Sequence, residues 1–296
     1  MLSFDGRVAI VTGSGRGLGA SHAKFLASRG AAVVINDLGG SAQGTGASSG
    51  PAEEVVADIV AAGGRAVANF DSVTENPEGI VQTAIDAFGR LDILVNNAGI
   101  NQAHAFGRDI LPSIRQHMEV HFFGTAGVTA AAWPHLIESG SGRVVSTTSP
   151  TLIGFPQQTP YVAAKGAIFA FTRTLALEGQ EVGIKVNAIA PTAATRMSDA
   201  ADLPDEFKQF MRDNLPTSLV SPVVAYLAHE NCAINGEVLQ AQGGEVQRLV
   251  LGFNEGFTSK DLTPELVQQH IDQILHPATH VPFKTIDEQD LSAVGK

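Results

Sequence analysis

Short apolar segments alternate along most of the chain with longer segments whose apolar residues recur every three or four positions. The short segments are rich in Val and Ile and end near Gly, Asp, Asn, Ser or Pro, which is typical of strands buried on both faces. We predict strands at residues 7–12, 31–36, 66–70, 93–96, 144–147, 185–188 and 237–240.

The longer segments have the periodicity of helices. Residues 51–62, for example, begin with proline and are followed by two glycines, the usual order of helix start and stop signals. We predict helices at residues 20–28, 51–62, 77–88, 111–133, 161–179 and 204–214. The alternation predicts an α/β fold with a single Rossmann-type, doubly wound parallel sheet of about seven strands and helices on both faces.

Two segments depart from this alternation. Residues 39–50 (GGSAQGTGASSG) are so rich in Gly and Ser that we expect a mobile loop, either a plain linker or a flap beside a ligand at Asp37. Residues 249–296 follow the last strand and include two or three short helical patterns. We expect them to be an extension that packs on the main domain, residues 1–248, or on a neighbouring subunit.

Composition narrows the class of protein. Of the 296 residues, 44% are apolar and 17% charged, so a sizeable core is expected and a disordered chain is excluded. The net charge of −11 argues against nucleic acid and anionic membranes as partners. A single cysteine, Cys232, favours a reducing compartment, and the N-terminal segment lacks the layout of a signal peptide. We expect a cytoplasmic protein.

A glycine-rich motif, TGSGRGLG at residues 12–19, lies between a predicted strand and a predicted helix. Glycines in such a turn let the backbone approach a diphosphate, whose charge then lies at the helix N-terminus. The motif therefore predicts a dinucleotide site, and makes residues 1–248 a dinucleotide-binding and catalytic domain. The cofactor residues predicted from this turn are Gly13, Gly15, Arg16, Gly17, Leu18 and Gly19.

The choice between NAD and NADP depends on two residues. Asp37 ends the second predicted strand, where a carboxylate accepts hydrogen bonds from the adenosine ribose and repels a 2′-phosphate. Arg16 could instead bind that phosphate. Because Arg16 can turn into solvent whereas Asp37 cannot, we favour NAD over NADP.

Tyr161 and Lys165 lie in the segment YVAAK, four residues apart and therefore on one face of the predicted helix. A nearby ammonium and a positively charged nicotinamide would both lower the pKa of the tyrosine and allow it to act as a base. A hydroxyl at the end of a neighbouring strand would hold the substrate oxygen. Ser149 is the better placed candidate, and Thr148 is the alternative.

Together these motifs resemble the classical short-chain dehydrogenases/reductases, over about residues 7–244. The matching pieces are TGSGRGLG, FDSV, NNAG, Ser149, YVAAK and PTAAT. The resemblance implies that Tyr161 is the acid/base, that Lys165 orients the nicotinamide ribose and that Ser149 polarises the carbonyl. It also implies further cofactor contacts from Asp71, Ser72, Val73, Asn97, Ala98, Gly99, Pro191, Thr192 and Thr195.

The segments VVINDLGG, AVANFDSV and EVHFFGT are similar to the dehydrogenase unit of peroxisomal multifunctional enzyme type 2. That resemblance implies a (3R)-hydroxyacyl-CoA substrate. A hydroxysteroid or other bulky alicyclic alcohol is the alternative, and a weakly catalytic NAD(H) sensor or scaffold is an alternative of another class. His121 stands where the family usually has an asparagine, and it could hold a water or relay a proton.

The substrate and assembly surfaces can be predicted less directly. Residues 192–215 are expected to form a lid, with an apolar wall of Met197, Leu203, Phe207, Phe210 and Met211. Cations for coenzyme A phosphates would come from Arg108, Arg196, Lys208 and Arg212. The resemblance implies a homodimer or homotetramer formed by helices 111–133 and 161–179. We expect no metal, since His276 and His280 flank prolines and lack a third ligand.

Overall fold

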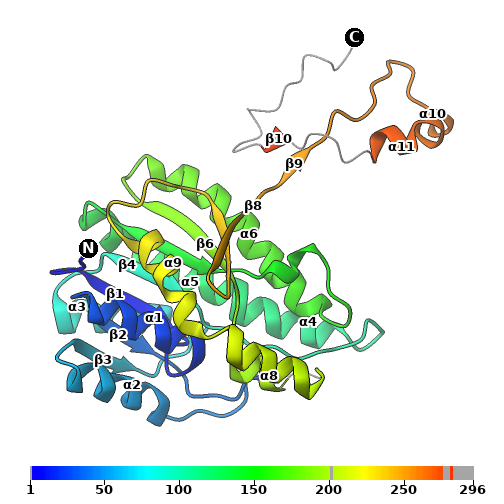
Figure 1. Ribbon diagram of the computed structural model, residues 1–296. Coiled ribbons are helices and arrows are strands. Elements are labelled where there is room, and N and C mark those ends of the chain that lie inside the picture. The colour runs from blue at the N-terminus through cyan, green and yellow to red at the C-terminus, as the bar shows by residue number, and fades with distance from the viewer. Residues whose placement is uncertain (1, 201–202, 276–280, 283–296) are drawn as a thin grey trace. The chain divides into compact units, whose positions relative to one another are not determined.

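The computed structural model describes residues 2–200, 203–275 and 281–282 (Figure 1). The chain divides into two compact units, Met1–Arg248 and Leu249–Lys296. The first unit carries the sheet and the helices around it. In the second, β9 (Gly252–Phe253) pairs antiparallel with β10 (Val281–Pro282), and two short helices occur, α10 (Pro264–Gln269) and α11 (Ile271–Ile274). His276 and His280 lie outside the described residues.

The first unit is built on one eight-stranded sheet in the order β3-β2-β1-β4-β5-β6-β7-β8. The strands are β1 (Val8–Thr12), β2 (Ala32–Asn36), β3 (Arg65–Asn69), β4 (Ile93–Asn96), β5 (Arg143–Thr147), β6 (Lys185–Thr192), β7 (Val238–Gln242) and β8 (Glu245–Leu249). Neighbouring pairs from β3 to β7 are parallel. The doubly wound parallel sheet is thus confirmed, and its order reverses between β1 and β4, where such sheets form a binding crevice.

Helices cover both faces of this sheet (Figure 1). One buried cluster joins the sheet to α1 (Gly17–Ser28), α2 (Gly50–Ala61) and α9 (Ser221–Ala228). The other joins it to α3 (Pro77–Phe88), α5 (Gly124–Glu138) and α6 (Thr159–Gln180). The strands β1, β2, β4 and β5 are buried along their whole length, which explains why they read as continuous apolar runs.

Three features differ from the elements predicted from the sequence. The helix predicted at 111–133 is α4 (Leu111–His117), a π-helical turn (Met118–Phe123) and α5. Strand β6 continues to Thr192 instead of ending at Ala188. Strand β8 was not predicted: Gly243 and Gly244, both with positive φ, turn the chain back beside β7.

No helix among the described residues is long and apolar enough to cross a membrane. The smaller helices of the first unit, α7 (Arg196–Ala200) and α8 (Asp205–Asn214), follow β6 and occupy the segment predicted to be a lid.

Candidate active site

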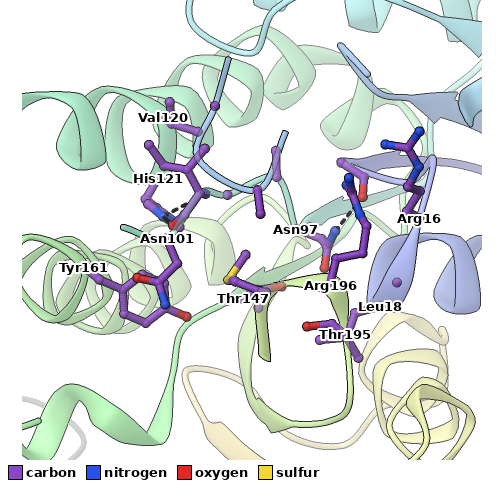
Figure 2. Close-up of a pocket in the computed structure, with 18 of the residues that line it drawn as sticks. Arg16, Leu18, Asn97, Asn101, Val120, His121, Thr147, Tyr161, Thr195 and Arg196 are labelled. Atoms are coloured by element: carbon purple, nitrogen blue, oxygen red, sulfur yellow. Dashed lines mark hydrogen bonds between the residues drawn. The ribbon is translucent and has the colours of Figure 1, made fainter. Parts of the chain in front are cut away.

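A pocket of about 430 Å³ lies at the carboxyl ends of the strands. It is lined by residues from the ends of β1, β2, β4, β5 and β6 and from the helices and loops that follow them. Figure 2 shows side chains from these separate segments facing one cavity. Every cofactor and catalytic residue predicted from the sequence lines this pocket except Gly15 and Gly19.

The glycine turn packs closely on itself and against the residues that follow β4, at positions where no side chain fits. A Cβ on Gly13, whose φ is +61°, would lie 2.7 Å from Ala98 Cα, and a Cβ on Gly19 would lie 2.3 Å from the Gly13 carbonyl oxygen. Helix α1 begins at Gly17, with no side-chain cap and no acidic residue in its first turn. Its free N–H groups and positive dipole end therefore favour an anion, so the turn fits a dinucleotide.

Asp37 is fixed by two backbone amides. The N–H of Gly15 donates to Asp37 Oδ2 at 2.7 Å, and the N–H of Gly39 donates to Oδ1 at 2.6 Å. A Cβ on Gly15 would lie 2.8 Å from Asp37 Oδ2. Gly15 therefore serves the site by letting Asp37 approach the turn, although it does not line the pocket.

Two guanidinium groups lie near this carboxylate. Arg16 and Arg196 are exposed and both line the pocket, with their side chains drawn close together in Figure 2. Burial lowers the pKa of Arg196, the charge of Arg16 lowers it further, and the charge of Asp37 raises it. All three charges therefore act on one another at this end of the pocket.

Two buried asparagines, Asn36 and Asn69, which the sequence analysis missed, support the walls of the pocket. Asn36, at the end of β2, donates to Asn69 Oδ1 at 2.8 Å and to the Asp71 carbonyl at 2.9 Å. Asn69 in turn donates to Asp71 Oδ2 at 2.7 Å. The available signal was an asparagine ending each of two neighbouring apolar strands, in VVIN and AVAN. Asn97 donates to the carbonyls of Thr12 and Gly13 at 3.0 Å and so joins the end of β4 to the glycine turn.

The face of α6 brings Tyr161 and Lys165 to the opposite part of the pocket. Lys165 is 3% exposed, its Nζ donates to the Thr147 carbonyl at 2.6 Å, and it lies 5.5 Å from the centroid of the Tyr161 ring. Burial lowers the pKa of Lys165 to about 7. An amine held this way loses its proton near neutral pH, unlike an exposed lysine.

The pKa of Tyr161 differs from our prediction. We expected Lys165 to lower it, but burial raises it in the structure, and a hydrogen bond with the Ser149 side chain acts in the opposite direction. Desolvation therefore dominates, because a phenolate is disfavoured in a dry pocket.

The two candidate hydroxyls have different partners. Thr148 Oγ1 donates to the Lys165 carbonyl at 2.8 Å, inside the protein. Ser149 Oγ lies 2.8 Å from Thr151 Oγ1 and accepts the Thr151 N–H at 3.2 Å, and the Ser149 side chain lowers the pKa of Tyr161. Of the two, Ser149 is therefore the hydroxyl that acts on the predicted acid/base.

His121 lies in the π-helical turn and its ring meets that of Tyr161 edge to face, with centroids 5.3 Å apart. Its Nε2 lies 2.7 Å from the Ile100 carbonyl oxygen and 3.2 Å from the Ile100 nitrogen, whereas its buried Nδ1 has no partner among the described residues. Burial lowers the pKa of His121 well below its usual value, and the charge of Lys165 lowers it further. The imidazole is therefore neutral, with one nitrogen unused.

The loop and the lid only partly follow the predictions. Residues 39–50 are not a plain linker, because Gly40, Ser41, Ala42 and Gly44 line the pocket, and the Ala42 carbonyl accepts the Asn101 N–H at 3.0 Å. In the lid, Met197 and Met211 line the pocket. Leu203, Phe207 and Phe210 do not, and the rings of Phe207 and Phe210 stack on one another while about half exposed.

Over residues 7–204 the sequence matches the family described as short chain dehydrogenase. The chain belongs to this family. Its members are oxidoreductases that bind nicotinamide cofactors, so this short-chain dehydrogenase acts on a CH–OH group of a small-molecule substrate or on the corresponding ketone. The resemblance inferred from the motifs is confirmed.

Three proteins to which this short-chain dehydrogenase is similar indicate its relatives within the family. A short-chain type dehydrogenase/reductase from Mycobacterium tuberculosis is 47% identical over 259 residues, 86% of this chain and 89% of the relative. The peroxisomal multifunctional enzyme type 2 of Mus musculus is 39% identical over 292 residues, which are 97% of this chain and 39% of that enzyme. The chain thus spans less than half of the mouse enzyme. Among solved structures, a 7α-hydroxysteroid dehydrogenase complexed with NADH and 7-oxoglycochenodeoxycholic acid has a TM-score of 0.73 and 27% identity, covering 82% of this chain and 95% of that one.

Proposed function

We propose that this short-chain dehydrogenase uses NAD to interconvert a (3R)-hydroxyacyl-CoA-like substrate and its 3-ketone. One observation carries the proposal: Tyr161 and Ser149, with Lys165 buried beside them, line one pocket with the glycine turn. A base, an oxygen-binding hydroxyl and a dinucleotide site are the parts that alcohol oxidation requires.

The cofactor would lie along the pocket from Asp37 to Lys165. The glycine turn and the start of α1 would hold its diphosphate, Asp37 its adenosine ribose, and Asp71, Ser72 and Val73 would flank its adenine. Thr195 and Lys165 would contact its nicotinamide half. When bound, the cofactor supplies the hydride acceptor of the reaction.

The position of Asp37 supports NAD over NADP. Its carboxylate is held by two N–H groups and cannot turn away from a 2′-phosphate, whereas the exposed guanidinium of Arg16 is free to move. Two like charges about 4 Å apart repel by on the order of 4 kcal/mol at an effective dielectric of 20. That repulsion would outweigh an exposed arginine–phosphate contact, which is worth about 1 kcal/mol or less.

Ser149 and Tyr161 would bind the substrate hydroxyl between them. Tyr161 would take the hydroxyl proton in oxidation and return it in reduction, with Ser149 donating to the substrate oxygen. The Lys165 ammonium, 5.5 Å from the Tyr161 ring centroid, would stabilise the phenolate. His121 would extend the proton path, because its ring lies edge to face with that of Tyr161.

The acyl-CoA substrate is inferred from relatives and from charge. A peroxisomal multifunctional enzyme matches 97% of this chain. Of the cations predicted for coenzyme A phosphates, Arg196 lines the pocket. Arg212 is instead paired with Asp199 at 2.9 Å. Arg196 is therefore the one of these four predicted cations that lines the pocket, and it does so at the Asp37 end.

A hydroxysteroid is the second candidate substrate. It is favoured by the similarity to a 7α-hydroxysteroid dehydrogenase and by the apolar side chains of Met197 and Met211 in the pocket. A rigid ring system would use these apolar contacts but would not need a phosphate-binding cation.

We further propose that two copies associate through α4, α5 and α6. Leu111, Phe123 and Leu177, in and between these helices, are each 45% or more exposed, and a second copy would remove such apolar side chains from water. Cys232 is buried and unpaired, which is consistent with the cytoplasmic location expected from the sequence.

Cofactor reduction with matched alcohols tests the substrate class. NADH formation would be followed at 340 nm with (3R)- and (3S)-hydroxyhexanoyl-CoA, with a 7α- and a 17β-hydroxysteroid, and with NAD or NADP. Preference for the (3R)-thioester and NAD would support the proposal, and preference for a steroid would replace it with the second candidate. Tight NADH binding without turnover of any alcohol would indicate the sensor or scaffold alternative.

A further inference from the structure

Asn101 presents an unsatisfied amide to the pocket. Its Oδ1 is buried and has no hydrogen-bond partner among the described residues, although the residue lines the same pocket as Tyr161 and Ser149. In Figure 2 its side chain projects into the cavity on the side of His121 and Tyr161. The amide nitrogen also has no hydrogen-bond partner among the described residues, so a ligand group that accepts a hydrogen bond is expected to pair with it.

The backbone around Asn101 is held at three successive residues. The Ile100 carbonyl accepts from His121 Nε2 at 2.7 Å, the N–H of Asn101 donates to the Ala42 carbonyl at 3.0 Å, and the N–H of Gln102 donates to His117 Nε2 at 3.3 Å. These bonds come from the π-helical turn, from the loop of residues 39–50 and from α4. The direction of the Asn101 side chain is therefore set by the fold.

The bond from Gln102 requires a neutral histidine. His117 Nδ1 lies 2.8 Å from the Ser113 carbonyl and must donate to it, so Nε2 carries no proton and can accept. Burial lowers the pKa of His117, which keeps the ring in this form. The ring also stacks on that of His121, with centroids 6.0 Å apart. The two histidines together support the segment that carries Asn101.

From this geometry we propose that Asn101 is a specificity-determining residue that binds a second polar group of the substrate, close to the reacting carbon. In a 3-hydroxyacyl thioester that group is the thioester carbonyl, which would accept from the Asn101 amide. The amide nitrogen carries two N–H donors, and the thioester carbonyl oxygen would accept one of them. A steroid alcohol lacks such a neighbouring carbonyl. The assignment of the thioester rests on the proposed function.

Removing the amide should affect only substrates that carry the carbonyl. Asn101→Leu keeps the approximate size of the side chain, and Asn101→Ser keeps a small hydrogen-bonding group. Gln102→Leu is the matched control. Gln102 is exposed and lies outside the pocket, and only its backbone N–H, not its side chain, takes part in the hydrogen bonds that hold this segment. The substrates are the N-acetylcysteamine thioester of (3R)-hydroxyhexanoic acid and 3-hexanol, which lacks the carbonyl.

Asn101→Leu should lower kcat/KM for the thioester by about 10- to 100-fold, as expected when a substrate group loses its buried partner, and leave 3-hexanol within about twofold. Asn101→Ser should recover part of the loss, and Gln102→Leu should lose nothing. The dissociation constant of NADH, measured by its fluorescence, should not change in any variant.

Two results would overturn the assignment without touching the proposed oxidoreductase. One is an equal loss on both substrates, and the other is weaker NADH binding by Asn101→Leu, which would make Asn101 a cofactor ligand. Turnover of 3-hexanol but not of the thioester by the unmodified protein would overturn both the acyl substrate and the role of Asn101.

Discussion

The ammonium of Lys165 donates a 2.6 Å hydrogen bond to the carbonyl of Thr147, at the end of β5. This bond joins α6 to the strand end that precedes Ser149. It therefore fixes the base, the amine and the oxygen-binding hydroxyl relative to one another. The amine is nearly inaccessible to water, and its pKa is lowered to about 7. A charged Lys165 at this buried position would stabilise the Tyr161 phenolate, but it lowers the free energy of unfolding of the protein.

Replacing this lysine should stabilise the fold in a pH-dependent way. The unfolded chain keeps the Lys165 proton up to its usual pKa of 10.5, whereas the folded chain releases it near pH 7. Below pH 7 both states are charged and the folded state bears the full desolvation cost, on the order of a few kcal/mol. Between pH 7 and 10.5 this cost falls as pH rises. Lys165→Met should therefore raise Tm by about 5 °C near pH 6, and by progressively less towards pH 10.

Thermal unfolding at several pH values, without cofactor, measures this effect. Lys24→Met is a suitable control, because Lys24 is 45% exposed and paired with Asp58 on the surface. A change in Tm for Lys165→Met that stays constant from pH 6 to pH 10 would contradict a buried, titrating amine.

Removing the Tyr161 hydroxyl should stop catalysis without preventing cofactor binding. Tyr161→Phe keeps the ring against His121 but loses the group that exchanges the proton. We expect kcat to fall by about 10²–10⁴-fold, the usual contribution of acid–base catalysis, with the NADH dissociation constant unchanged. Stopped-flow turnover and fluorescence titration measure the two quantities. Activity close to that of the unmodified protein would require another base.

The charge of Asp37 should govern cofactor choice. Asp37→Asn keeps the shape of the side chain beside Gly15 and removes the repulsion of a 2′-phosphate. The ratio of kcat/KM for NADP to that for NAD should rise by about 100-fold. Adding Arg16→Gln should reverse much of this gain, since Arg16 would then be the phosphate ligand. An unchanged ratio in Asp37→Asn would show that another group selects the cofactor.

Gly99 should be required by the position of His121. A Cβ on Gly99 would lie 2.5 Å from His121 Cε1 and 2.9 Å from Nδ1. Gly99→Ala should cost about 1–3 kcal/mol in the free energy of unfolding, as overpacking usually does. Combining it with His121→Ala should cost less than the sum of the two changes. Urea unfolding gives these values. Gly166→Ala, with no atom within 4 Å of the new Cβ, is the control, and additive costs would argue against a direct clash.

The sequence was sufficient for elements whose signals are local. The strands before Gly13 and Asn97 and the helix that carries Tyr161 and Lys165 were predicted within a few residues, because burial on both faces and helical periodicity are visible in the chain itself. Strand β8 had a local signal too, the pair Gly243-Gly244 with two positive φ values, and was missed because the following residues are mostly polar. The π-helical turn has no comparable signal, since it depends on packing around His117 and His121.

The residues of the candidate site also differ in whether local sequence signals predict them. The glycine turn, Asp37 and the Tyr161–Lys165 pair follow from residue types at fixed spacings. The role proposed for Asn101 does not, because it depends on a loop, a helix and a π-helical turn that meet at three successive residues. The pKa of Tyr161 was predicted in the wrong direction for the protein by itself, since a sequence shows a neighbouring amine but not the depth of burial.

Because of the π-helical turn at Met118–Phe123, the position of His121 beside Tyr161 depends on the length of this segment as well as on which residues it contains. A π turn accommodates one residue more than the α-helical turn it replaces. Deleting a single residue between His117 and Gly124 would allow a continuous α-helix to form, and every side chain on one side of the deletion would rotate by about 100° about the helix axis. His121 would then leave Tyr161, or α5 would turn its apolar face away from the sheet. In this segment, gaps and insertions among homologous sequences are therefore a more sensitive sign of altered activity than substitutions.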